Sequence, residues 1–270
     1  MSNEIYDSVL DDIKNRARWE TRQGIWYQMR NDGLRRKVKP WPNAADMHFP
    51  LIDTTINKLK PAFFQQAMGL DVLATFVPMR SQLAGFTTAA EHWFSYKLHE
   101  KSNYATEVMS WIDHMLVSGH SVMKTFWNPD EKRVEFQAID PMYIIVPPWT
   151  KDIKSADRIT QVMPMSLESY KRAGIYDDSR SVTDRIKSGK VEDAGIIDTL
   201  KYDKEIREGI THSMDEEQVI VWEVYSHDED GKWVMECFSP QAPDIPLREK
   251  MEVPFDHDNP PFASCKYEIT

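Results

Sequence analysis

Two groups of neighbouring acidic residues and histidines could in principle bind a metal or take part in a reaction. Asp256-His257-Asp258 places three possible metal ligands in a row, but alternation along an extended chain would separate their side chains. Prolines on both sides favour a polar loop there. Asp113 and His114 are adjacent on a predicted helix, so their directions differ by about 100°. We expect this second pair to lie on an exposed helix face.

Two further acidic stretches match functional motifs only in part. Asp228, Asp230 and Gly231 resemble part of a calcium loop, but Ser226 and Cys237 stand where its first Asp and closing Glu belong. Residues 129–132 (PDEK) hold the letters of a nuclease metal site crowded into one turn, where they cannot converge on an ion. Glycine-rich phosphate loops, HExxH and GxSxG are absent from the sequence. We therefore assign no catalytic, cofactor-binding or metal-binding residue, and no cofactor.

A basic segment next to a rigid tryptophan is the candidate interface. It comprises Arg35, Arg36 and Lys37, followed by Trp41. Pro40 and Pro42 restrict the backbone around this tryptophan, which lowers the entropy lost when it becomes an anchor against a partner. Packing within its own subunit, and a merely solvated charge cluster, are the alternatives.

Helical periodicity dominates the first part of the chain. The predicted helices are 4–31, a helix that begins after Pro50, is interrupted by Pro61 and ends at Gly69, then 87–100, and one running from an Asn103 N-cap to Gly119. Residues 73–77 are predicted to form a short strand. In the helix before Gly119, an apolar stripe of Tyr104, Val108, Trp111, Ile112, Met115 and Leu116 should face the core.

Strand patterns and turn residues follow. Two hairpins are expected, pairing 122–127 with 133–139 and 218–225 with 232–238, and a short helix at 166–173 lies between them. Residues 176–213 are charged and poor in large apolar groups, which predicts a partly mobile insert of helices and loops. The class is α+β, with a mainly helical part at 1–120 and a β-rich part at 121–270 in one continuous structural unit.

The segment from Lys39 to Gly69, KPWPNAADMHFPLIDTTINKLKPAFFQQAMG, resembles the N-terminal region of portal proteins from tailed double-stranded DNA bacteriophages. That family often places a Trp-Pro loop ending in proline before a helix that leads into small and aromatic residues. Later features occur in the family's order, over about 130 residues: Val117-Ser118-Gly119-His120, Ile139-Asp140-Pro141, Val146-Pro147-Pro148 and Met165-Ser166-Leu167-Glu168.

The resemblance implies a portal wing-like region and a structural role. Portal subunits form a ring of about twelve copies at one capsid vertex, through which DNA is packaged and ejected. The implied partners are other portal subunits, the major capsid protein, the terminase large subunit, the tail adaptor and DNA in the channel. Portal subunits are usually longer, so channel-lining helices and a terminase-facing clip are expected beyond Thr270, in a longer protein or a companion chain.

Composition agrees with that role without selecting it. The net charge of −10 argues against tight phosphate binding but suits a conduit in which DNA slides. The sequence has no run of 18 apolar residues, and its first residues are acidic, so we expect no membrane partner, assembly in the host cytoplasm and location in the virion. The alternatives are a metal-dependent hydrolase or nuclease, and a sugar-binding virion module that uses exposed tryptophans.

Overall fold

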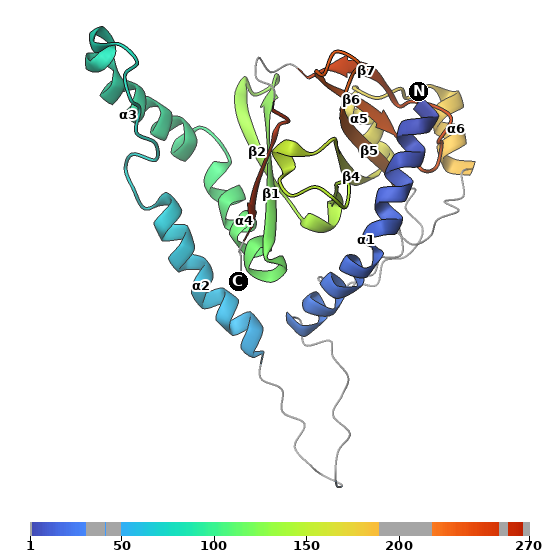
Figure 1. The fold of residues 1–270 in the computed structure, drawn as a ribbon, viewed down its shortest axis with the longest axis horizontal. Helices are drawn as coiled ribbons and strands as arrows, with labels where there is room; N and C mark the ends of the chain where they lie inside the picture. Colours follow the sequence, from blue (N-terminus) through green and yellow to red (C-terminus); the bar gives the residue numbers. More distant parts are fainter. Residues whose placement is uncertain (1, 31–40, 42–49, 189–217, 254–258, 267–270) are drawn as a thin grey trace. The chain divides into compact units, whose positions relative to one another are not determined.

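The computed structural model describes residues 2–30, 41, 50–188, 218–253 and 259–266. The chain divides into two compact units, each discontinuous in sequence. Unit 1 comprises Met1–Arg36 and Pro141–Pro260, and unit 2 comprises Lys37–Asp140 and Pro261–Thr270. The class is α+β, as predicted, with helices early and antiparallel hairpins later (Figure 1). The compact units therefore follow long-range contacts, and their boundaries differ from a division at residue 120.

Unit 2 combines three helices with a three-stranded antiparallel sheet. Its elements are α2 (Leu51–Met68), a 3₁₀ turn (Ser81–Leu83), α3 (Ala84–Glu100), α4 (Tyr104–Ser118), β1 (His120–Asn128), β2 (Arg133–Ile139) and β8 (Phe262–Lys266). Strand β1 is central, with β2 on one side and β8 on the other. The first predicted hairpin is confirmed, with Thr125 opposite Phe136, whereas the sequence patterns did not predict β8.

Helix α4 joins the helices of unit 2 to its sheet. Val108 and Ile112 of its apolar stripe are buried and pack with Met68 of α2 and Met123 of β1. The helix ends as predicted at Gly119, whose φ of 69° is the left-handed conformation that glycine adopts without strain. The stripe prediction is therefore confirmed, with Trp111 half-buried at its margin.

Two local predictions in unit 2 were wrong. Helix α2 continues through Pro61, although proline removes a backbone donor, and its buried residues Ile56 and Met68 lie on either side of the proline. Residues 73–77 form no strand. In that segment the Leu73 N–H donates to Ser95 Oγ (3.0 Å) and the Phe76 N–H to Glu91 Oε1 (2.7 Å). Side chains of α3 thus take the place of a partner strand.

Unit 1 is built on a five-stranded antiparallel sheet in the order β3-β4-β5-β6-β7. Its elements are α1 (Ser2–Arg30), β3 (Ile144–Ile145), β4 (Arg158–Ser166), α5 (Leu167–Ala173), α6 (Arg180–Ser188), β5 (Gln218–His227), β6 (Trp233–Phe238) and β7 (Arg248–Glu252), with 3₁₀ turns at Pro141–Tyr143 and Ile153–Ser155. The second predicted hairpin, β5–β6, is confirmed, with Tyr225 opposite Met235.

Strand β5 is covered on both faces, which explains its nearly continuous apolar sequence. Ile220, Trp222 and Val224 pack with Val9 and Ile13 of α1. Their neighbours on the opposite face, such as Val219 and Val221, pack with the short helices α5 and α6 instead. Helix α1 therefore forms one layer, the sheet the second, and α5 with α6 the third.

Two arginines form hydrogen bonds between α1 and the rest of unit 1. Arg16 of α1 donates hydrogen bonds to the backbone carbonyls of Met142 and Ile144. Arg158 of β4 donates from Nε to Asp12 Oδ2 at 3.1 Å. Burial raises the pKa of the Asp12 carboxyl, and the hydrogen bond from Arg158 only partly offsets that effect. These bonds join segments about 130 to 150 residues apart in sequence.

Strand β4, which the sequence patterns did not predict, contains Pro164 opposite Ile220 of β5. Strand β3 is only two residues long and pairs with Thr160 and Gln161. Pro164 therefore lies where β4 has a single partner strand, and a missing backbone donor is tolerated in such positions.

The charged segment predicted at 176–213 is described only in part. Its helix α6 buries Val182 and Ile186, and residues 189–213 lie outside the described part of the chain.

Both cysteines, Cys237 and Cys265, are free thiols. Among the described residues no helix is both long and apolar enough to cross a membrane.

We expect Ile112→Ala to lower the free energy of unfolding by about 2–5 kcal/mol, because it opens a cavity beneath the α4 stripe. Ile52→Ala is the matched control, since the side chain of Ile52 is 45% exposed and its loss should cost well under about 1 kcal/mol. Chemical denaturation of both variants measures the difference. Equal costs would contradict the assignment of the core to this face.

We also expect acid to destabilise unit 2 through His120. Burial, and then the charge of Lys266, lower the pKa of this imidazole to about 4. An unfolded histidine binds its proton below about pH 6.5, so the stability that depends on neutral His120 is complete above that pH. It is lost as the pH falls from about 6.5 towards 4. Urea denaturation at several pH values should show a smaller acid loss for His120→Gln than for the parent chain, and identical losses would refute the assignment.

Candidate interaction surface

The acidic turn that resembles part of a calcium loop serves local structure. In the turn after β5, Asp228 Oδ1 accepts hydrogen bonds from the backbone N–H groups of Asp230 (3.0 Å) and Lys232 (2.9 Å). Gly231 completes the turn with φ of 79°. Asp256-His257-Asp258 falls outside the described residues. Within the described ranges no three His, Cys, Asp or Glu side chains lie close enough together to hold a metal ion.

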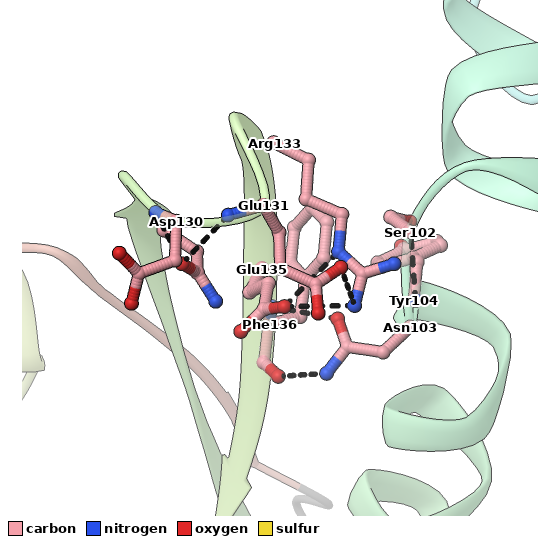
Figure 2. A network of polar contacts seen from close by, with 9 residues as sticks. Ser102, Asn103, Tyr104, Asp130, Glu131, Arg133, Glu135 and Phe136 are labelled. Carbon is pink, nitrogen blue, oxygen red and sulfur yellow. Dashed lines mark hydrogen bonds and ion pairs between the residues drawn. The ribbon is translucent and has the colours of Figure 1, made fainter.

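The acidic turn between β1 and β2 is likewise a structural network (Figure 2). Asn128 Oδ1 accepts the backbone N–H groups of Asp130 and Glu131. Arg133 lies between two carboxylates, with Nη2 at 3.2 Å from Glu131 Oε2 and 2.9 Å from Glu135 Oε1. Hydrogen bonds from Arg133, and then Asn128, lower the pKa of Glu135 below its ordinary value. The arginine therefore neutralises the turn that resembled a nuclease motif.

Asn103 does not cap α4 with its side chain, contrary to the sequence prediction. Its amide instead pairs with the backbone of Phe136 in β2, donating to the carbonyl at 2.6 Å and accepting the N–H at 2.9 Å (Figure 2). Glu107, one turn further along α4, accepts the N–H of Ala138 at 2.7 Å. The side chains of Asn103, just before α4, and of Glu107 within it thus occupy the open edge of β2, where another strand could otherwise pair.

Asp113 and His114 are not an exposed pair, and that prediction was wrong. Asp113 Oδ1 lies 3.1 Å from Lys60 Nζ of α2, and His114 Nδ1 lies 3.5 Å from Oδ2 of the buried Asp140. The two side chains diverge along the helix and find separate partners. The face of α4 opposite the apolar stripe is therefore polar and only partly exposed, because its side chains pair with Lys60 of α2 and with Asp140, which follows β2.

The structure describes only one residue of the predicted interface. Trp41 is 64% exposed, which leaves most of its ring available to a partner. Arg35, Arg36 and Lys37 lie outside the described residues.

A larger apolar surface lies on residues 51–100, which we name the α2–α3 arm. Eleven of the eighteen exposed large apolar side chains in the described residues belong to it. They are Leu51, Ile52, Leu59, Leu70, Phe76, Val77, Met79, Leu83, Phe86, Trp93 and Tyr96, exposed between 37% and 97%. So many exposed apolar side chains on one segment make the arm the candidate interaction surface among the described residues.

Sequence reasoning missed this surface because it identified residues 87–100 as a helix without establishing which of its apolar side chains would stay exposed. In the structure Phe94 packs edge-on against Phe76 of the arm at 5.6 Å between ring centroids, whereas Trp93 is 62% exposed. Helix α3 is apolar on two faces, a pattern typical of a helix that is covered all round. Apolar residues on two faces of α3 were therefore the sequence feature that could have indicated this exposed surface.

The sequence matches no known protein family and no curated protein. The physical properties of the described surface therefore carry the functional interpretation, together with the order of motifs in the sequence.

We expect Asn103→Ala to destabilise unit 2 by about 1–3 kcal/mol, because the backbone donor and acceptor of Phe136 both lose their partner. The control is Asn57→Ala, whose amide bonds to Asp53 on the exposed surface of its own helix and should cost no more than about 0.5 kcal/mol. Thermal and urea unfolding measure both effects. A cost for Asn103→Ala as small as the control's would show that water replaces the amide at this edge.

Proposed function

We propose that the chain is a structural subunit of a ring similar to the portals of tailed bacteriophages. One observation carries this proposal: the α2–α3 arm exposes eleven large apolar side chains. Burying such side chains against another protein is the dominant favourable term in association. A subunit that functions only when assembled has this property, whereas an enzyme acting as a monomer would gain nothing from it.

The order of motifs in the sequence is what favours a portal subunit over other ring-forming proteins. The Trp-Pro loop at 39–50, the helix after Pro50 and the later motifs stand in the order that portal subunits use. The helix after Pro50 and the helix ending at Gly119, both predicted from apolar periodicity, are present as α2 and α4. The net charge of −10 is compatible with a channel that lets DNA slide, because tight phosphate binding needs clustered cations.

In this role the chain would form part of a channel wall and would catalyse no reaction. Twelve or so copies would surround the DNA at one capsid vertex, each touching two neighbours through different surfaces, since only a head-to-tail contact closes a ring. The other partners would be the major capsid protein, the tail adaptor and the terminase, which supplies ATP hydrolysis for packaging. The site of action would be the virion.

We expect the purified chain to self-associate with rising concentration, and electron micrographs to show rings or arcs of one curvature. Native mass spectrometry measures the masses. Trp41→Ala should reduce the assembled fraction while leaving the melting temperature unchanged within about 2 °C, because most of that ring is exposed. A chain that stays monomeric throughout would contradict the proposal. Metal-dependent hydrolysis of DNA or glycans, lost in Asp256→Ala or His257→Ala, would favour the hydrolase alternative.

A further inference from the structure

The face of α3 that carries Glu91, Phe94 and Ser95, here called the inner face, packs within unit 2. Ser95 is buried and accepts the Leu73 N–H, Glu91 accepts the Phe76 N–H, and Phe94 contacts the Phe76 ring. These contacts fix the helix against the preceding segment of the arm. The rotation of α3 about its own axis is thereby set, and so is the face that it turns outwards.

The outer face carries an apolar seam at heptad spacing. Phe86, Ala89, Trp93 and Tyr96 follow one another at intervals of three, four and three residues, which places them on one side of the helix, away from Ser95. All four are exposed, with Phe86 at 71%, Trp93 at 62% and Tyr96 at 48%. This spacing is that of a seam on which a second helix packs, and the small Ala89 between the aromatic rings permits a close approach.

Two lysines hold the aromatic rings of the seam in place. Lys97 Nζ lies 5.6 Å from the centroid of the Trp93 ring, and Lys101 Nζ lies 5.7 Å from that of Tyr96. Such cation–π contacts are weak but favourable at exposed sites. Rings that are ordered before binding lose less entropy on association, which suits them as anchors.

The charge of the arm indicates what kind of partner covers the seam. Residues 51–100 hold four cationic and four anionic side chains, so the arm is neutral although the chain carries −10. A neutral apolar surface has no attraction for DNA phosphates or anionic lipid headgroups, which need a cationic excess. It does allow another acidic chain of the same kind to approach without repulsion at the point of contact.

The size of the surface fits the same partner. From their exposed fractions, the eleven apolar side chains of the arm offer on the order of 1,000 Å², of which the three rings of the seam supply roughly 400 Å². A stable interface needs about 800 Å² from each partner, so the seam would form the centre of a contact that extends along the arm. We propose that the seam Phe86–Ala89–Trp93–Tyr96 packs against a helix of a second copy of this chain. This inference rests on the proposed function and names the surface by which one subunit meets the next.

The test compares two tryptophans of nearly equal exposure. Trp93→Ala removes the central anchor of the seam, whereas Trp127→Ala removes a ring that is 57% exposed on β1, outside the arm. Sedimentation velocity of the full chain should show self-association weakened roughly tenfold or more by Trp93→Ala, and similarly by Phe86→Ala, but by less than about twofold in Trp127→Ala. Circular dichroism should show all three variants folded.

Cross-linking provides an independent readout. In a mixture of ¹⁴N and ¹⁵N chains, lysine-reactive reagents should join Lys97 or Lys101 of one copy to a different copy, and Trp93→Ala should reduce these links. Unchanged association of Trp93→Ala and Phe86→Ala would overturn the seam while leaving a ring built through other surfaces. Discrete dimers that Trp93→Ala abolishes would support the seam and contradict the ring. A parent chain that binds anionic phosphatidylserine vesicles through Trp93 yet never self-associates would overturn both.

Discussion

The five-stranded sheet of unit 1 depends on being covered by the N-terminal helix. Trp222 and Phe238 are fully buried, and α1 supplies Val9 and Ile13 to the cluster that contains them. Water would otherwise reach this whole face of β5. The polar bonds of Arg16 and Arg158 fix where the helix lies, and apolar burial provides most of the energy. Because α1 is distant in sequence, the unit gains this cover only by closing a loop of more than 100 residues.

Local periodicity made α1, α2, α4 and both hairpins predictable from the sequence, because each carries its own helical or alternating apolar pattern. The features that could not be predicted depend on hydrogen-bond and packing partners that lie elsewhere in the sequence. Residues 73–77 have strand-like composition, but the groups that bond to their backbone are Ser95 and Glu91. Asparagine is a residue type that commonly caps helices, but the Asn103 amide bonds instead to the carbonyl and the N–H of Phe136 in β2. The exposure of Trp93 likewise depends on which face of α3 finds cover.

Unit 2 closes one of its surfaces to other chains and leaves another open. The edge of β2 is occupied by Asn103 and Glu107, so its backbone groups offer no strand-pairing site there. On the outer face of α3, Phe86, Trp93 and Tyr96 are exposed within the described part of the chain. Strand pairing at an edge is tolerant of sequence, whereas helix packing depends on the size and spacing of side chains. Association through the arm is therefore the more selective of the two routes.

The interleaving of the two units also has a consequence for synthesis on the ribosome. Strand β5 lies almost 190 residues after the end of α1, so at about 5–20 residues per second the apolar stripe of α1 waits on the order of ten to forty seconds for its sheet. Strand β1 must likewise wait for β8, which begins 134 residues after β1 ends, at Phe262 against Asn128. Neither unit can reach its final packing before its own last strand has been synthesised, and until then Val9 and Ile13 of the nascent helix lack the cover that β5 provides.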